Sequence, residues 1–121
     1  MRRGAIFVGP SGWSYPSWTH TVAKGVRLED RLKFVSRLFN AAEVNGSFYV
    51  QIAPETYRAW RDTTPPGFRF AVKGHRYVTH YKRLHDCRDP VRRLRAQAGA
   101  LGDKLAAVLW QLPAQIGRAH V

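Results

Sequence analysis

The chain alternates short apolar runs with longer segments in which apolar residues recur every three or four positions. Short runs that end in Gly or polar residues are typical of buried strands, whereas the longer period is typical of helices packed on one face. We expect strands near residues 5–9, 41–46, 68–73 and 105–111, and helices near residues 28–39, 54–63 and 90–101. This order predicts an α/β fold of four parallel strands alternating with three helices and joined by right-handed crossovers.

The expected helix boundaries rest on capping and breaking residues. Pro54 opens the second helix, and the Pro-Pro-Gly run at 65–67 stops it. Asp89 followed by Pro90 is an N-cap and first-turn pattern for the third helix, which Gly102 ends. The segments that follow the strands are long, notably 10–27 and 74–88, and they are rich in aromatic, basic and His residues. Ligands bind at the carboxyl ends of parallel strands, so we expect the functional site there.

Two charged residues on neighbouring strands are the main catalytic candidates. Side chains two apart on a strand share a face, so Glu43 lies with Asn45, and Lys73 lies with Arg69 and Ala71. If both faces point the same way, Glu43 and Lys73 can form an ion pair. The functional interpretation makes Glu43 a general acid or base and Lys73 an electrostatic stabiliser. The alternative is a purely structural ion pair.

His80 is the third catalytic candidate, as an acid, a base or a hydrogen-bond donor, with a plain loop residue as the alternative. His75, His80 and His85 are five residues apart, which is neither a helical ligand pair nor a zinc-finger spacing. A metal shared by Glu43 and His80 is an alternative. We expect no metal site, and the cofactor is unknown.

The remaining candidates would bind a ligand. The hydroxyl and backbone N–H groups of Ser11 and Gly12 can hold an anion, and the Gln111 amide can orient a hydroxyl or carbonyl. Aromatic residues near the strand ends are either ligand contacts or core residues that cap the sheet. The ligand-binding candidates are Ser11, Gly12, Trp13, Asn45, Tyr49 and Gln111.

Composition favours an anionic partner. The 121 residues include 20 Lys and Arg against 8 Asp and Glu, a formal net charge of +12. Residues 76–95 contain seven of these bases and two acids, so a basic segment that binds nucleic acid is an alternative to a small anionic ligand. Cys87 is the only cysteine, which fits a reducing cytoplasm. We expect neither a membrane span nor a signal peptide. The oligomeric state does not follow from the sequence.

A set of ordered motifs resembles the amino-terminal half of the YecE-like proteins, domain-of-unknown-function family 72. The resemblance implies a TIM-type (β/α) barrel, of which the predicted elements would be a truncated part, and it leaves open whether the protein is an enzyme. Pro10, Gly74-His75 and Ala114 depart from the family pattern. The matching residues are Gly9-x-Ser11-Gly12-Trp13, Trp18, Glu43-x-Asn45, Phe48-Tyr49, Pro54-Glu55-Thr56, Thr64 to Phe68, Phe70-x-x-Lys73, Thr79-His80, Leu84 and Gln111-Leu112-Pro113.

The last six residues, Ile-Gly-Arg-Ala-His-Val, translate the beginning of a common sequencing adapter. We therefore expect residues 1–115 to be the amino-terminal half of the barrel domain and residues 116–121 to be adapter read-through. The alternative is a natural basic tail. As a fragment, the chain is expected to be inactive by itself.

Overall fold

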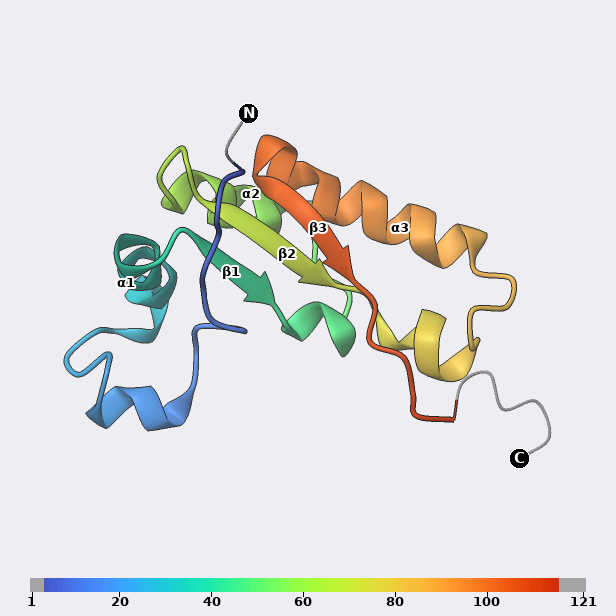
Figure 1. Ribbon diagram of the computed structural model, residues 1–121, viewed down its shortest axis with the longest axis horizontal. Helices are drawn as coiled ribbons and strands as arrows, with labels where there is room; N and C mark the ends of the chain where they lie inside the picture. The colour runs from blue at the N-terminus through green and yellow to red at the C-terminus, as the bar shows by residue number, and fades with distance from the viewer. Residues whose placement is uncertain (1–3, 116–121) are drawn as a thin grey trace.

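The computed structural model describes residues 4–115 and shows an α/β fold with a three-stranded parallel sheet in the order β1-β2-β3 (Figure 1). The strands are β1 (Ala41–Val44), β2 (Arg69–Lys73) and β3 (Leu105–Leu109). The α-helices are α1 (Arg31–Leu38), α2 (Pro54–Thr63) and α3 (Arg88–Ala98). Short 3-10 helices cover Pro16–His20, Leu28–Asp30, Gly46–Phe48 and Gly99–Lys104, and a one-turn π-helix covers Tyr77–Tyr81.

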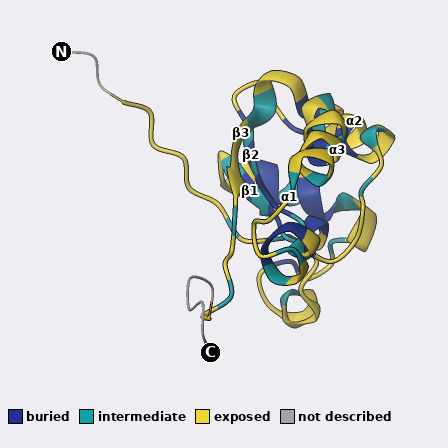
Figure 2. Cartoon of the chain, turned by 90° about the vertical axis from the view of Figure 1, so that its right-hand side faces the viewer, coloured by how far each residue is buried: buried dark blue, intermediate teal, exposed yellow. Residues whose placement is uncertain are grey.

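The helices and the sheet form two layers. Figure 2 shows all three α-helices on one side of the sheet. The alternation of β2 explains this arrangement, because Phe68, Phe70 and Val72 are fully buried towards the helices, as their spacing predicts. Tyr57 of α2 and Leu94 of α3 pack against them in the same core cluster. Each such side chain contributes about 1.5–3 kcal/mol when buried, so this layer holds the fold together.

The prediction of four strands in this part of the barrel is corrected by the structure, which has three. The parallel direction and sequential order of β1, β2 and β3 are confirmed, but the segment near residues 5–9 is not a strand. The Asn40 side chain accepts a hydrogen bond from the Val8 N–H at 2.7 Å and donates one to the Ile6 carbonyl at 2.9 Å. These bonds use backbone groups that a strand would pair with β1. Residues 4–115 therefore do not close a barrel.

Gly9 lies against the backbone of Ala41, but within residues 4–115 the first segment forms a β-bridge with β1 only near its carboxyl end. Ser11 forms a single parallel bridge with Glu43, through the Glu43 N–H to the Pro10 carbonyl and the Gly12 N–H to the Glu43 carbonyl, both 2.9 Å. Pro10 has no N–H, so it cannot extend this ladder as a donor. The apolar side chain of Ile6 stays 81% exposed. The carboxyl end of β1 thus gains a partner where the candidate site lies.

Several predicted boundaries shift. The first helix splits into the Leu28–Asp30 turn and α1. Helix α3 begins at Arg88 with Cys87 in the N-cap position, so the expected N-cap, Asp89, lies inside the first turn. Asn45 and Gln111, expected on strands, lie just past β1 and β3.

No helix in residues 4–115 has the length and apolar character needed to cross a membrane. The adapter prediction for 116–121 falls outside the described residues.

Candidate functional site

The carboxyl ends of β1 and β2 bring several predicted site residues together. We call Ser11, Glu43, Asn45, Phe48, Lys73 and His80 the carboxyl-end cluster. The parallel register places Glu43 opposite Ala71 and Val44 opposite Val72, so both strands end at the same edge of the sheet. The sequence folds this way because the apolar alternation of each strand gives way to Gly and polar residues at that edge.

Lys73 is the central residue of the cluster. Its side chain is largely buried, and the residue is 8% exposed. The ammonium donates to the Asn45 Oδ1 at 3.2 Å and lies 4.5 Å from the centre of the Phe48 ring. The four ion pairs found in residues 4–115 all involve Arg, and none includes Lys73. The ammonium of this buried residue is thus held by an amide oxygen and an aromatic face, and it forms no ion pair with a carboxylate of residues 4–115.

The expected Glu43–Lys73 ion pair is wrong. Because Glu43 pairs with Ala71 in the register, Lys73 lies two residues further along the neighbouring strand, an offset of about 6.6 Å along the strand direction in addition to the spacing between the strands. The Glu43 carboxylate instead accepts a hydrogen bond from the Ser11 hydroxyl at 3.2 Å. Asn45 takes the place expected for Glu43 beside the ammonium. The structure therefore places Glu43 and Lys73 in two separate hydrogen-bonded pairs, Glu43 with Ser11 and Lys73 with Asn45.

Phe48 links Lys73 to His80. The Phe48 ring meets the His80 ring edge to face at 5.2 Å and the Tyr49 ring at 4.9 Å. The Thr79 hydroxyl and the His80 Nδ1 are 2.8 Å apart, a hydrogen bond that fixes the imidazole. Tyr49 is more than half exposed and lies beneath the Arg76 guanidinium at 5.5 Å. His80 therefore belongs to the cluster and Tyr49 borders it, and their catalytic and ligand-binding roles stay predictions.

Two residues that sequence reasoning did not select build this site. The Ser47 hydroxyl donates to the Lys73 carbonyl at 2.6 Å and approaches the Val44 carbonyl at 3.1 Å, which joins the ends of β2 and β1. Phe48 supplies the aromatic face for Lys73. Both lie in the turn that follows β1. The change from apolar to polar residues at the end of this strand is the sequence feature that could have indicated them.

The other ligand-binding candidates lie apart from Lys73. Gly12 adopts φ +84°, and its N–H is used by the Glu43 carbonyl, so this amide is not free for an anion. Trp13 packs edge to face on Trp60 and Phe70 at 5.1 and 6.2 Å, which is the core alternative for this residue. Gln111 is exposed beyond β3. Residues 4–115 contain no group of three or more His, Cys, Asp or Glu side chains suited to a metal.

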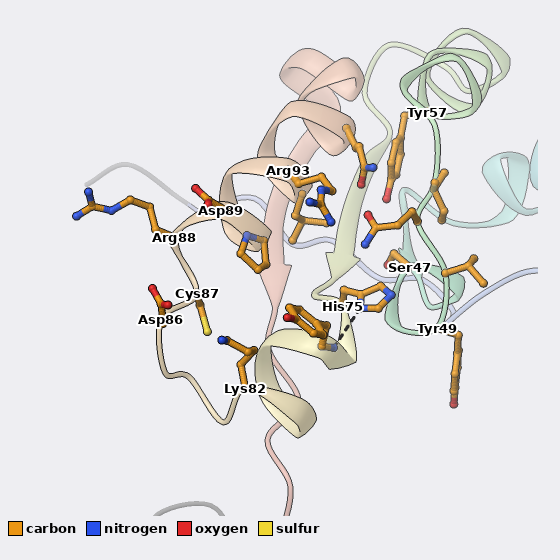
Figure 3. A pocket seen from close by; sticks show the side chains of 17 residues that line it. Ser47, Tyr49, Tyr57, His75, Lys82, Asp86, Cys87, Arg88, Asp89 and Arg93 are labelled. Atoms are coloured by element: carbon orange, nitrogen blue, oxygen red, sulfur yellow. Dashed lines mark hydrogen bonds between the residues drawn. The ribbon is translucent and has the colours of Figure 1, made fainter.

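A separate cleft of about 1060 Å³ opens beside this cluster (Figure 3). It lies between α2, the start of α3 and the turns that follow β1 and β2, and it shares Ser47 and Tyr49 with the surroundings of Lys73. His75 lines the cleft and accepts a hydrogen bond at Nδ1 from the Tyr77 N–H at 3.1 Å. Burial lowers the pKa of His75, and the guanidinium groups of Arg76 and Arg93 also lower it. A backbone hydrogen bond with Tyr49 opposes this shift in part, and the net effect favours the neutral imidazole.

Comparison with known proteins supports the resemblance. UPF0759 protein YecE of Escherichia coli K12 is 31% identical over 112 residues, which are 93% of this chain and 39% of that protein. The chain thus spans about two fifths of the length of this relative. A DUF72 family protein of Thermotoga maritima superposes with a TM-score of 0.74 at 28% identity, covering 88% of this chain and 44% of that one.

A DUF72 family protein of Enterococcus faecalis shares the fold, with a TM-score of 0.71 at 18% identity over 90% of this chain and 40% of that one. The family model described as protein of unknown function DUF72 matches residues 7–121. This match covers nearly the whole chain and agrees with the sequence and structural relatives. The chain therefore belongs to the DUF72 family.

Proposed function

We propose that the carboxyl-end cluster binds a small anionic or polar ligand of the phosphoester or sugar-phosphate type. The observation that carries this proposal is the ammonium of the buried residue Lys73, which contacts an amide and an aromatic ring but forms no ion pair with a carboxylate of residues 4–115. An unpaired charge is costly to bury, and a bound anion would supply the missing partner. Asn45 and Phe48 would then position the ammonium towards that anion.

The remaining residues of the cluster would act on the bound ligand. The Glu43 carboxylate, hydrogen-bonded to the Ser11 hydroxyl, would accept or donate a proton. His80 is held by Thr79 and packs on Phe48, the ring that also contacts the Lys73 ammonium. This position would let His80 act on a ligand bound at Lys73. We propose these as acid and base roles, with Lys73 as the electrostatic contact. Whether the ligand is turned over depends on groups that complete the site.

The proposal places this sheet in a TIM-type barrel of the longer protein. In such a barrel, the open face of the sheet would line the interior and the carboxyl-end cluster would lie at the mouth. The chain spans 39% of the length of YecE, so other strands of a full-length protein would complete the site. The fragment alone would then be inactive.

Nucleic-acid binding by the basic segment is the alternative. Arg88 and Arg93 line the cleft together with Lys82, and Arg92 and Arg95 are exposed outside it. Exposed bases of this kind can contact phosphates by charge alone, without a built site. Oligonucleotide binding is therefore an outcome of the test below rather than a second proposal.

The test is titration calorimetry of the chain with glycerol phosphate and with a single-stranded oligonucleotide. We expect Lys73→Met to weaken glycerol phosphate binding at the cluster at least tenfold. Lys24→Met, which removes the same charge from an exposed site outside the cluster, should have no effect. Equal affinity for both variants would overturn the proposal. Oligonucleotide binding that falls steeply with salt and is insensitive to Lys73→Met would favour the alternative.

A further inference from the structure

The large cleft beside the cluster carries an inference independent of Lys73. Its volume of about 1060 Å³ is at the upper end of the range for small-molecule sites. Neither Glu43, Lys73 nor His80 lines it. Its walls come from α2, the first turns of α3 and the turns that follow β1 and β2, and they carry hydrogen-bond donors of several kinds (Figure 3).

Tyr57 is the residue that most clearly lacks a partner. Its side chain points from α2 into the cleft (Figure 3), the residue is 0% exposed, and its hydroxyl has no hydrogen bond within residues 4–115. Burial raises the pKa of Tyr57 to about 12, and the nearby Ser47 opposes this shift in part. The Ser47 hydroxyl itself is directed at two backbone carbonyls. The Tyr57 hydroxyl is therefore a protonated donor whose neighbouring acceptor, the Ser47 oxygen, lies close enough to lower its pKa but outside hydrogen-bond geometry. A buried donor left unsatisfied in this way costs about 1–3 kcal/mol.

The N-terminus of α3 adds a second group of donors. Cys87 occupies the N-cap position, and no side chain caps the helix there. The Cys87 thiol instead points to the Val78 and His85 carbonyls. Arg88 and Asp89, whose N–H groups begin the helix, line the cleft. An uncapped helix start presents N–H groups and positive partial charge, which favour anions.

The charges of the cleft also favour an anion. Arg88 and Arg93 line it together with Lys82, against the carboxylates of Asp86 and Asp89, so the cations are in excess. His75 is neutral for the reasons given above and adds no charge. The phenol rings of Tyr49 and Tyr77 also line the cleft and are partly exposed, which provides aromatic surface for the body of a ligand.

We propose that this cleft is a binding site for a small organic phosphate that carries a planar ring. Its phosphate accepts hydrogen bonds from the Tyr57 hydroxyl and the Arg93 guanidinium, with the start of α3 contributing positive potential. Its ring lies against the tyrosines that line the cleft. Because the Tyr57 hydroxyl is buried, binding requires the groups that cover it to move aside. The site is separate from the Lys73 site and does not depend on the function proposed for it.

The test uses phenyl phosphate as the probe. Its binding is measured by calorimetry and by changes in the amide signals of α3 in nuclear magnetic resonance spectra. We expect Tyr57→Phe and Arg93→Met each to weaken binding about tenfold. Two matched controls lie outside the cleft: Arg92→Met on the same helix and the exposed Tyr81→Phe. Both controls should bind like the wild-type chain. Phenyl phosphate that fails to bind, or that binds all four variants equally, would overturn the inference.

Two further measurements separate this site from the others. Tyr57→Phe should melt at the same temperature as the wild-type chain or higher without ligand, because it removes a hydroxyl that has no partner. Reduced affinity in a variant that is equally stable then reports a lost ligand contact rather than misfolding. Lys73→Met should leave phenyl phosphate binding at the cleft unchanged. If Lys73→Met alone abolishes it, the probe binds the carboxyl-end cluster and the cleft inference is wrong.

Discussion

The ammonium of Lys73 donates to the side-chain oxygen of Asn45 across the ends of two parallel strands, at 3.2 Å. This contact replaces the ion pair with Glu43 that strand alternation alone predicts. An amide oxygen satisfies one donor of the ammonium without neutralising its charge. The charge of Lys73 is therefore still available to a ligand, whereas a carboxylate partner would have cancelled it.

Asn45 and Lys73 should be energetically coupled, whereas Glu43 and Lys73 should not. Asn45→Ala removes a hydrogen bond to a charged group, so we expect it to lower the free energy of unfolding by about 1.5–3 kcal/mol. In a Lys73→Met background the same change should cost less. The free energies of Glu43→Gln and Lys73→Met should add within about 0.5 kcal/mol. Denaturant unfolding of the wild-type chain, the single mutants and the double mutants of both cycles measures these free energies. Coupling of Lys73 with Glu43 but not with Asn45 would contradict the structure.

Gly74 should tolerate no side chain. A Cβ added there would lie 2.1 Å from the ring of Trp110, which packs against the core. We expect Gly74→Ala to destabilise the fold by about 1–3 kcal/mol, because the indole ring must shift. Gly99→Ala is the matched control, since nothing lies within 4 Å of that position and its φ of −58° is helical. Gly99→Ala should be neutral or stabilising by up to about 1 kcal/mol. Melting temperatures that rank the two variants in the opposite order would contradict this packing.

His75 should make the fold less stable in mild acid. Burial, together with Arg76 and Arg93, lowers the pKa of His75 in the folded protein below its ordinary value of 6.5. Above pH 6.5 the imidazole is neutral in both states and contributes nothing. As the pH falls below 6.5, the unfolded state takes up the proton first, so stability decreases until the folded-state pKa is passed. His75→Gln should reduce the slope of melting temperature against pH between 6.5 and 5. Identical slopes for the two proteins would contradict the pKa shift.

The sequence predicted the helix layer and the site edge well, and the reasons are local. Phe68, Phe70 and Val72 alternate strictly, and this pattern determines which face of β2 meets the helices. The first strand was predicted from the same kind of apolar run. Its pairing depends on a distant side chain, that of Asn40, which no local pattern reveals.

The details of the site depended on register rather than residue type. Alternation places Glu43 and Lys73 on corresponding faces, but only the pairing of Glu43 with Ala71 shows that they are offset along the strands. The unpartnered hydroxyl of Tyr57 was also beyond sequence reasoning. Only three-dimensional packing shows that this hydroxyl is buried within residues 4–115 without a hydrogen bond of good geometry.

The free edge of the sheet should make the chain associate with itself. Within residues 4–115, strand β3 pairs only with β2, and its residues Ala107 and Leu109 are exposed, as is Val8 near the opposite edge of the sheet. Unpaired backbone groups on an apolar edge strand pair readily with another chain. We expect sedimentation to show dimers or larger species whose proportion rises with concentration.

A charge on that edge should reverse the association. Ala107→Lys places a lysine on an exposed position of β3, a substitution that blocks strand pairing between chains. Ala96→Lys adds the same charge at an exposed position of α3, away from the edge, and should leave the association unchanged. If the wild-type chain sediments as a single monomeric species at every concentration, the prediction is wrong. If both lysine variants dissociate equally, net charge rather than the β3 edge controls association, because the two variants differ only in where the charge lies.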